Sequence, residues 1–245
     1  MKTIIDNYEF ITFKKDNAEF IFSTAKNDLN FNKDLKEGRD NLKLLQDYFN
    51  LKDVGYVNQI HSSIIQEYDG TVKSGDAIVT DKTNIGIGIF TADCMPVLIY
   101  DKNKNIAAAV HSGWKGTSKN ITGKAIGCLV DRYGSCAKDL TVYIGPHNRE
   151  FCYEFGDSAI YEYFGDIYKK DKSIYINNKL NLEKCIYYQL MDKEVSSENI
   201  NTLDLCTYCS GEYKFYSYRR DKSSGRMFSF VVIRNNWFME IGLPH

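Results

Sequence analysis

The sequence lacks long apolar runs, an excess of charge of either sign, and proline. No stretch approaches the roughly 18 consecutive apolar residues of a membrane-spanning helix, so a membrane protein is not expected. Lys and Arg number 31 against 32 for Asp and Glu, and a net charge of -1 attracts neither nucleic acid nor an anionic membrane. The first ten residues, MKTIIDNYEF, lack the apolar segment of a signal peptide. We therefore expect a cytoplasmic protein that binds neither nucleic acid nor membranes.

Disulfide frameworks and domain linkers are also missing. The seven cysteines are odd in number and irregularly spaced, which argues for reduced thiols in a chain without a secretion signal. We find no internal repeat, low-complexity tract or proline-rich linker, and only three prolines. A chain of 245 residues with 43% hydrophobic content can bury a sizeable core. The sequence therefore predicts one domain over residues 1–245.

Apolar periodicity predicts many strands and a few helices. Strands are expected over residues 8–13, 19–23, 56–61, 64–68, 77–80, 85–90, 97–100, 106–111, 140–144 and 227–233. Helices are expected over residues 40–49, 157–164 and 182–191, with another capped by Thr117 and closed at Gly134. Several strands are continuous apolar runs, which indicates coverage on both faces. This pattern predicts an α+β fold of stacked mixed sheets with helices outside.

Two histidines and one cysteine end strand-like apolar runs in the middle of the chain. The runs YVNQIH, GIGIFTADC and NIAAAVH finish at His61, Cys94 and His111. Two imidazoles and one thiolate are good zinc ligands, and three protein ligands usually leave a fourth position for water, as in catalytic sites. The other histidines, His147 and His245, are expected in an exposed loop and at the end of the chain. Each residue taken singly is most often without function, but the set predicts a catalytic metal site.

Two aspartates lie at strand boundaries near the candidate thiol. Asp93, which directly precedes Cys94, is a candidate for orienting an imidazole or transferring a proton, with a turn-capping role as the alternative. Asp76 precedes the next expected strand in the same region. The Gly86-x-Gly88 pair lacks a third glycine and a following helix, so a dinucleotide-binding fold is not expected.

A glycine-bearing turn follows His111 directly. In HSGWKGTS, the residues Gly113, Lys115, Gly116 and Thr117 lead from a strand into a helix, without the spacing of a nucleotide P-loop. The N-terminus of a helix offers free backbone N–H groups and a positive dipole end to an anion. We therefore predict a phosphate cradle here, with an ordinary strand-to-helix turn around a core Trp114 as an equal alternative.

Two further patterns lie in the last quarter of the chain. Cys206-x-x-Cys209 resembles half a zinc knuckle or a redox pair, but no second CxxC is present and no helix clearly begins there, so structural thiols are favoured. Arg219, Arg220 and Arg226, in FYSYRRDKSSGRMFSF, form a basic loop. Such a loop can clamp phosphate or a carboxylate in bidentate geometry, and a solvated loop is the alternative.

Five separate motifs, in this order, resemble those of the YlmD/YfiH family. They are NQIH, DAIVT with TADCMPV, AVHSGWKG, IGP with CYEFG, and FYSYRRD with SGRMFSF. The resemblance extends from about Tyr56 to the end of the terminal strand. The family is known as multicopper polyphenol oxidase (laccase), peptidoglycan editing factor and purine nucleoside phosphorylase, and includes laccase domain-containing protein 1.

The resemblance implies a zinc-dependent purine nucleoside enzyme with a four-layer α-β-β-α sandwich. The implied reactions are phosphorolysis of adenosine, inosine and S-methyl-5'-thioadenosine, together with adenosine deamination. The family's metal ligands fall on His61, Cys94 and His111, with zinc expected and copper as a second candidate ion. Where the family commonly has HAGWRG, this chain has Ser112 and Lys115. Lysine keeps the charge of arginine but loses its fork geometry.

These implied reactions agree with the chemistry of the candidate residues. Zinc lowers the pKa of a bound water toward about 7, which suits attack on purine C6. Phosphorolysis also needs an anion cradle near the sugar, for which the 113–117 turn with Lys115 and an arginine of the 219 loop are candidates. Asp76 and Asp93 are candidates for protonating the leaving base. The expected partners are small purine nucleosides and phosphate, with the oligomeric state left open.

Two other classes of function fit the same residues. Cys94 activated by His111 would be the nucleophile of a cysteine hydrolase or amidase, which suits the peptidoglycan-editing name and peptidoglycan precursor peptides. A non-catalytic zinc protein would use the three ligands only to join strand ends. Copper-dependent phenol oxidation is the weakest alternative, since reducing oxygen to water requires several copper ions and more histidines than the four present.

Overall fold

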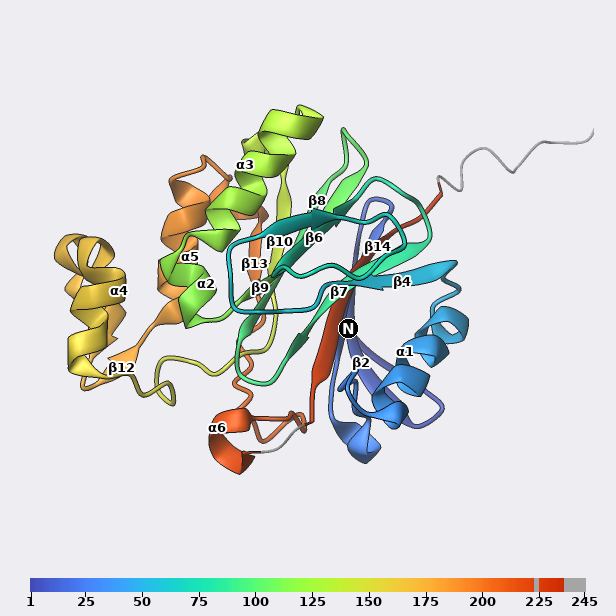
Figure 1. The fold of residues 1–245 in the computed structure, drawn as a ribbon, viewed down its shortest axis with the longest axis horizontal. Coiled ribbons are helices and arrows are strands. Elements are labelled where there is room, and N and C mark those ends of the chain that lie inside the picture. The colour runs from blue at the N-terminus through green and yellow to red at the C-terminus, as the bar shows by residue number, and fades with distance from the viewer. Residues whose placement is uncertain (223–224, 236–245) are drawn as a thin grey trace, which may run out of the picture.

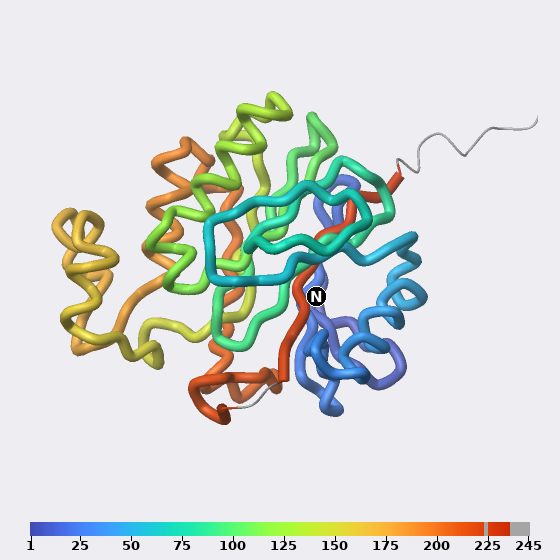
Figure 2. The backbone as a smooth tube through the Cα atoms, in the orientation of Figure 1, coloured from blue at the N-terminus to red at the C-terminus, as the bar shows by residue number. Residues whose placement is uncertain are grey.

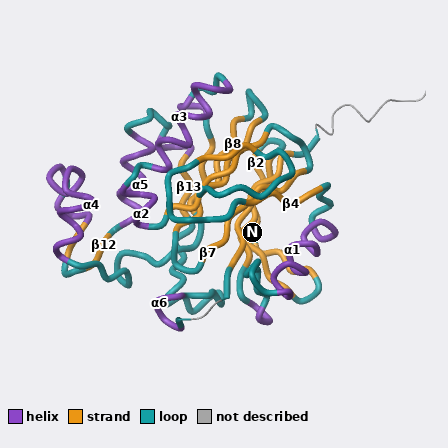
Figure 3. Tube along the Cα trace, in the orientation of Figure 1, coloured by secondary structure: helices purple, strands orange, loops and turns teal. Residues whose placement is uncertain are grey.

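Two six-stranded β-sheets form the centre of the molecule. The structure is a computed structural model, and it describes residues 1–222 and 225–235, so His245 lies outside the described residues. Figure 1 shows α1 (Lys36–Tyr48) on one side of the strands and α3 (Ile121–Tyr133), α4 (Asp157–Lys170) and α5 (Leu182–Met191) on the other. Figure 3 shows the same layers by secondary structure. The expected four-layer α-β-β-α sandwich is confirmed.

The first sheet joins both ends of the described chain. Its order is β1-β2-β3-β14-β7-β4, and only the β4–β7 pair is parallel. The strands are β1 (Lys2–Ile5), β2 (Tyr8–Lys15), β3 (Ala18–Ser23), β14 (Met227–Ile233), β7 (Ile85–Thr91) and β4 (Asp53–Tyr56).

The second sheet uses the middle of the chain. Its order is β13-β10-β8-β9-β6-β5, with parallel pairs β10–β13 and β5–β6 at its two edges. The strands are β13 (Ile200–Thr202), β10 (Thr141–Ile144), β8 (Met95–Asp101), β9 (Ile106–Ser112), β6 (Ala77–Thr80) and β5 (Ile65–Glu67). A separate pair, β11 (Tyr175–Ile176) and β12 (Lys179–Leu180), lies near α4.

Three apolar clusters bind the layers together. Side chains alternate across a strand, so Leu98 of β8 contributes to the cluster between the sheets while Val97 contributes to the cluster under α3, α4 and α5. A third cluster packs Phe230 of β14 against Leu45 of α1. Every residue of β7, β8 and β9 is buried, as the continuous apolar runs predicted. Among the described residues, no helix is long and apolar enough to cross a membrane.

The remaining helices are short. They are α2 (Trp114–Ser118) and α6 (Tyr218–Asp221), with 3-10 turns at Lys26–Asp28, Ala137–Asp139, Lys172–Ile174 and Ser197–Asn199. α2 and α3 form where one helix capped by Thr117 was expected. That boundary was wrong: Gly113 is the N-cap of α2, Thr117 lies inside α2, and Asn120 in left-handed conformation begins α3.

The expected strand over residues 56–61 was also wrong. β4 ends at Tyr56, and residues 57–64 form a loop in which His61 has a left-handed φ of 54°. The strand pairing stops early: beyond Tyr56 only Asn58 forms an isolated parallel bridge, with Ser74, and the backbone N–H groups of His61 and Ser62 donate to the Asp76 carboxylate. The Gly86-x-Gly88 pair has a packing role, since a Cβ at Gly88 would lie 2.4 Å from the Phe228 ring on the neighbouring strand.

Candidate metal centre and adjoining cavities

The candidate site lies where the chain passes between the two sheets. His61 belongs to the loop that leaves β4 of the first sheet for β5 of the second. Cys94 belongs to the turn of residues 92–94 between β7 of the first sheet and β8 of the second. His111 lies near the end of β9, beside β8. Two crossings and one strand end thus bring together residues that are far apart in the sequence.

The three predicted metal ligands converge. The ligating atoms of His61, Cys94 and His111 all lie within 4.8 Å of one another. The two imidazole rings meet edge to face, with centroids 4.9 Å apart. His111 is buried, Cys94 is half-buried and His61 is exposed, so the site opens toward solvent on the His61 side. Ligand type and convergence fit a zinc or copper ion, with room for an external ligand.

The Asp76 carboxylate contacts both histidines, the ring of His111 and the backbone N–H of His61. Its carboxylate is fully buried, and Oδ1 lies 2.8 Å from His111 Nδ1 and accepts a 3.0 Å hydrogen bond from the His61 backbone N–H. Oδ2 accepts hydrogen bonds from the N–H and hydroxyl of Ser62 at 2.6 and 2.7 Å. A carboxylate on Nδ1 fixes the proton there and leaves Nε2 of His111 for a metal.

The electrostatics of the site favour a thiolate. Burial alone would raise the pKa of Cys94, but the charge of His111 and hydrogen bonds from His111 and His61 lower it to about 6. The same pairing, with Asp76, raises the pKa of His111 despite its burial. Burial also opposes ionisation of Asp76, yet hydrogen bonds from His111 and Ser62 hold its pKa below the usual value. Cys94, His111 and Asp76 thus each favour the charged form of the neighbour that they contact.

Gly113 leaves the space in which the ligands meet. A Cβ at this position would lie 2.8 Å from Cys94 Sγ and 3.4 Å from the His61 ring. The backbone of Gly113 is extended, with φ −77° and ψ 170°, so the glycine is required by contact and not by conformation. Its position at the metal site was not predicted, because a sequence shows the turn but not what faces it.

Asp93 is a connector between loops. It is buried at a left-handed φ of 90°, accepts a hydrogen bond from the Thr207 hydroxyl at 2.8 Å, and accepts another from the Arg219 backbone N–H at 2.7 Å. The predicted Asp93 therefore lies beside Cys94 and ties the turn of Cys94 to the segment between β13 and α6. The role of Thr207 was missed, since an isolated threonine in a loop carries no pattern.

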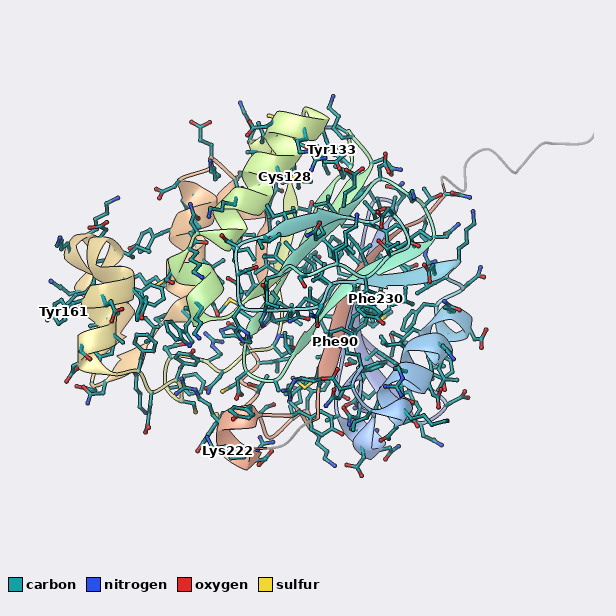
Figure 4. The ribbon with its side chains drawn as sticks, in the orientation of Figure 1. Phe90, Cys128, Tyr133, Tyr161, Lys222 and Phe230 are labelled. Carbon is teal, nitrogen blue, oxygen red and sulfur yellow. The ribbon has the colours of Figure 1, made fainter. Side chains whose placement is uncertain are left out.

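Two cavities adjoin the three ligands. The smaller, of about 540 Å³, lies toward α1 and is lined by Asn58, Gln59, Phe90 and Arg226 among others. The larger, of about 790 Å³, lies toward α6 and is lined by aromatic side chains and cations. Its aromatic rings and cations are Trp114, Phe151, Tyr153, Tyr208, Tyr218, Lys179, Arg219 and Lys222. Both cavities include His61, Cys94 and Tyr218. Figure 4 labels Phe90, which lines the smaller cavity, and Lys222, which lines the larger.

Among the predicted phosphate-binding residues, Arg219 lines the larger cavity, whereas Lys115, Gly116 and Thr117 line neither cavity. Lys115 is exposed, with its ammonium 5.5 Å from the Trp114 ring centroid, and lines neither of these cavities. Gly116 and Thr117 are buried, and the Thr117 hydroxyl donates to the Gly113 carbonyl at 3.0 Å. Arg219 lines the larger cavity, with its guanidinium 4.2 Å from the Tyr153 ring centroid.

Arg220 holds a loop. Its guanidinium donates to the carbonyls of Thr207, Tyr208 and Phe215 at 2.8–2.9 Å and to the Asp221 carboxylate. These contacts use all five N–H groups of the side chain, so binding a phosphate through Arg220 requires breaking them. In Figure 2 the loop that contains these carbonyls and α6 lie at the lower edge of the molecule, beside β14.

His147 is not in an exposed loop, as the sequence suggested. It is 2% exposed, its Nδ1 lies 3.0 Å from the Gly145 carbonyl, and its Nε2 lies 3.3 Å from the Glu183 carboxylate. His147 is buried because its backbone forms a parallel bridge with Cys206, in the segment between β13 and α6.

Comparison with known proteins places the chain in a family. The family described as multi-copper polyphenol oxidoreductase laccase matches residues 15–234. The chain belongs to this family. It is 53% identical to a purine nucleoside phosphorylase of Clostridium acetobutylicum, over 93% of this chain and 97% of that protein. It is 30% identical to the purine nucleoside phosphorylase YlmD of Bacillus subtilis, over 79% of this chain and 76% of that protein.

Solved structures confirm the fold of this family. The hypothetical protein YfiH of Bacillus licheniformis superposes with a TM-score of 0.84 at 23% identity, covering 94% of this chain and 97% of that one. YlmD from Geobacillus stearothermophilus superposes with a TM-score of 0.76 at 21% identity, covering 89% and 93%. The predicted resemblance to YlmD and YfiH is thereby confirmed.

Proposed function

We propose that this chain is a zinc-dependent purine nucleoside phosphorylase that also deaminates adenosine. The observation that carries the proposal is the convergence of His61, Cys94 and His111 at the meeting point of two cavities. Relatives named purine nucleoside phosphorylase support the reaction class. The proposed substrates are adenosine, inosine and S-methyl-5'-thioadenosine.

His61, Cys94 and His111 would hold the zinc. Bound there, zinc supplies a Lewis acid and lowers the pKa of water toward about 7, which is the chemistry that deamination needs. Asp76 orients His111 and the His61 backbone, and its carboxylate also accepts hydrogen bonds from Ser62 and from the Ile60 backbone N–H. We therefore assign Asp76 a positioning role and leave proton transfer by Asp76 or Asp93 as a prediction from the sequence.

The larger cavity suits a nucleoside and phosphate. Phe151, Tyr208 and Tyr218 are large apolar side chains that remain exposed on its wall, and purine bases stack on such rings. Its volume falls in the usual range for small-molecule sites. Burial and nearby negative charge raise the pKa of Tyr153, so its phenol remains a hydrogen-bond donor on the same wall.

Arg219 is the proposed phosphate ligand. It lines the cavity with Lys179 and Lys222, and its backbone is anchored through Asp93 to the turn of Cys94. In phosphorolysis a phosphate oxygen forms a bond to C1' while the C1'–N9 bond breaks, and the base leaves with a proton. A guanidinium beside the sugar would hold the phosphate for this attack. The alternative cradle of Gly113, Lys115, Gly116 and Thr117 stays a prediction.

The test uses metal-quantified protein and a nucleoside panel with and without phosphate, with products identified by mass. Free base and ribose 1-phosphate should form only with phosphate, and inosine should form from adenosine without it. Arg219→Gln should raise the phosphate concentration needed for base release while deamination is spared. Lys115→Ala should do so only if the turn is the cradle, and Lys119→Ala, an exposed cation nearby, serves as the control. A panel without phosphate-dependent base release would refute the proposal.

A cysteine hydrolase is the second candidate. The lowered pKa of Cys94 beside His111 is also the pairing that activates a thiol nucleophile. Such an enzyme, acting for example as an amidase on peptidoglycan precursor peptides, should survive thorough chelation and be inactivated by alkylation of Cys94. A zinc enzyme should lose activity on chelation and recover it when zinc is restored. A non-catalytic zinc protein would show neither activity.

A further inference from the structure

A second group of thiols converges away from the His61–Cys94–His111 centre. The sulfur atoms of Cys152, Cys206 and Cys209 all lie within 4.8 Å of one another. Cys152 comes from the loop between β10 and α4, whereas Cys206 and Cys209 come from the segment between β13 and α6. Cys206 is buried, Cys152 is half-buried and Cys209 is exposed. Three thiols from two separate segments thus meet at one point.

The loop from Cys206 to Cys209 is shaped around the sulfur of Cys206. The Arg149 backbone N–H lies 3.5 Å from Cys206 Sγ and points at it. A backbone N–H directed at sulfur stabilises negative charge there, and a metal-bound thiolate carries that charge.

We propose that Cys152, Cys206 and Cys209 bind a second zinc ion. Thiolates favour zinc over hard ions such as magnesium and calcium, and three converging sulfurs supply most of a tetrahedral site. A disulfide would use only two of the three thiols and would not account for the position of the third beside them. The sequence showed only two members of this group, Cys206 and Cys209, because the third lies 54 positions before Cys206 in the chain.

The proposed ion joins two loops that line the larger cavity. Phe151 and Tyr153 flank Cys152, Tyr208 lies between the other two ligands, and all three aromatic residues line that cavity. The segments already touch through the bridge between His147 and Cys206. Cys152 itself also lines the cavity, so a metal here would hold the aromatic wall in place from one side of that cavity. The ligands are different residues from His61, Cys94 and His111, so this inference does not depend on the proposed activity.

The test is a cobalt titration of reduced, metal-free protein. Cobalt bound to thiolates gives charge-transfer absorption whose intensity grows with the number of sulfur ligands. Wild-type protein should bind two ions per chain, and Cys94→Ala should retain one ion with the stronger, three-sulfur spectrum. Cys209→Ser, at an exposed position, should lose that spectrum and retain the other ion. Cys136→Ser, an exposed cysteine outside the cluster, should bind two ions.

A second measurement counts thiols. With zinc bound, Cys152, Cys206 and Cys209 should be protected together from alkylation, and chelation should expose all three, as read by peptide mass spectrometry. Circular dichroism of each variant separates metal loss from unfolding. The proposal is overturned if folded Cys94→Ala protein binds no thiolate-ligated cobalt. It is equally overturned if reduced Cys209→Ser protein still binds two ions, or if zinc leaves the three thiols unprotected.

Discussion

Replacing Gly113 by alanine tests whether the metal centre is built by close contact. The residue lies between a strand and a short helix, and its extended backbone is one that alanine adopts without strain. The added Cβ would lie 2.8 Å from Cys94 Sγ, where real Cβ atoms essentially never approach. The substitution therefore acts on the position of the thiolate and not on the local backbone.

The size of the effect follows from the contact distance. Ordinary contact begins at 3.4 Å, so the 2.8 Å separation must open by several tenths of an ångström. Metal–ligand distances tolerate deviations of only about 0.2 Å. We expect zinc affinity to fall about 10–100-fold, the range seen when groups supporting metal ligands are removed. That corresponds to about 1.4–2.8 kcal/mol of binding free energy.

The assay is competition for zinc against a chromophoric chelator, with thermal unfolding of metal-free protein measured in parallel. Gly156→Ala is the matched control, because Gly156 is also a helix N-cap with extended backbone and no heavy atom within 4 Å of its built Cβ. Gly156→Ala should change metal-free stability by no more than about 1 kcal/mol, as at sites that accept a Cβ. Gly113→Ala should lower it by about 1–3 kcal/mol, because the clash with Cys94 exists without metal, and its loss of zinc affinity should come in addition. Unchanged zinc affinity in Gly113→Ala would refute the reasoning, as would an equal loss in Gly156→Ala.

Two further substitutions test the supports of the site. The Asp76 carboxylate accepts hydrogen bonds from two backbone N–H groups and from the His111 ring. Asp76→Asn puts an amide N–H donor in place of one of its oxygens, so zinc affinity should fall about 10–100-fold. Ser62→Ala, which removes one hydroxyl donor and leaves the His111 contact, should lose less, and equal losses would contradict this assignment. Arg220→Lys removes most of the carbonyl contacts of the guanidinium, which should cost about 1 kcal/mol. A melting temperature lower by about 2–4 °C is expected, and an unchanged value would show that the contacts are not needed.

The sequence predicted the buried parts of this molecule well. Continuous apolar runs located β7, β8 and β9, and these strands place Cys94 and His111 as expected. Apolar periodicity predicted a strand wrongly at His61, whose backbone N–H donates to the Asp76 carboxylate and not to a neighbouring strand. It also failed at α2, because a two-part helix and a single helix bury the same residues at similar spacing.

Contacts between distant segments could not be predicted in the same way. The hydrogen bond from Thr207 to Asp93 joins residues 114 positions apart, and neither residue belongs to a strand or helix. The clearance at Gly113 depends on two other crossings of the chain between sheets. A single sequence records the residues of such contacts but not their meeting, since the meeting is decided by the packing of the whole sandwich.

The division between buried frame and exposed wall has a consequence for function. His111, Asp76 and Gly113 are fixed by strands and buried hydrogen bonds, so the candidate metal centre takes its geometry from the folded sandwich itself. Phe151 and Tyr218, by contrast, are exposed on the segments that follow β10 and β13. Loops presented by a rigid scaffold are where ligand preference is set. Substitutions of the buried residues His111, Asp76 and Gly113 should therefore change metal occupancy. Substitutions of the exposed residues Phe151 and Tyr218 should change which nucleoside is used while metal occupancy stays constant.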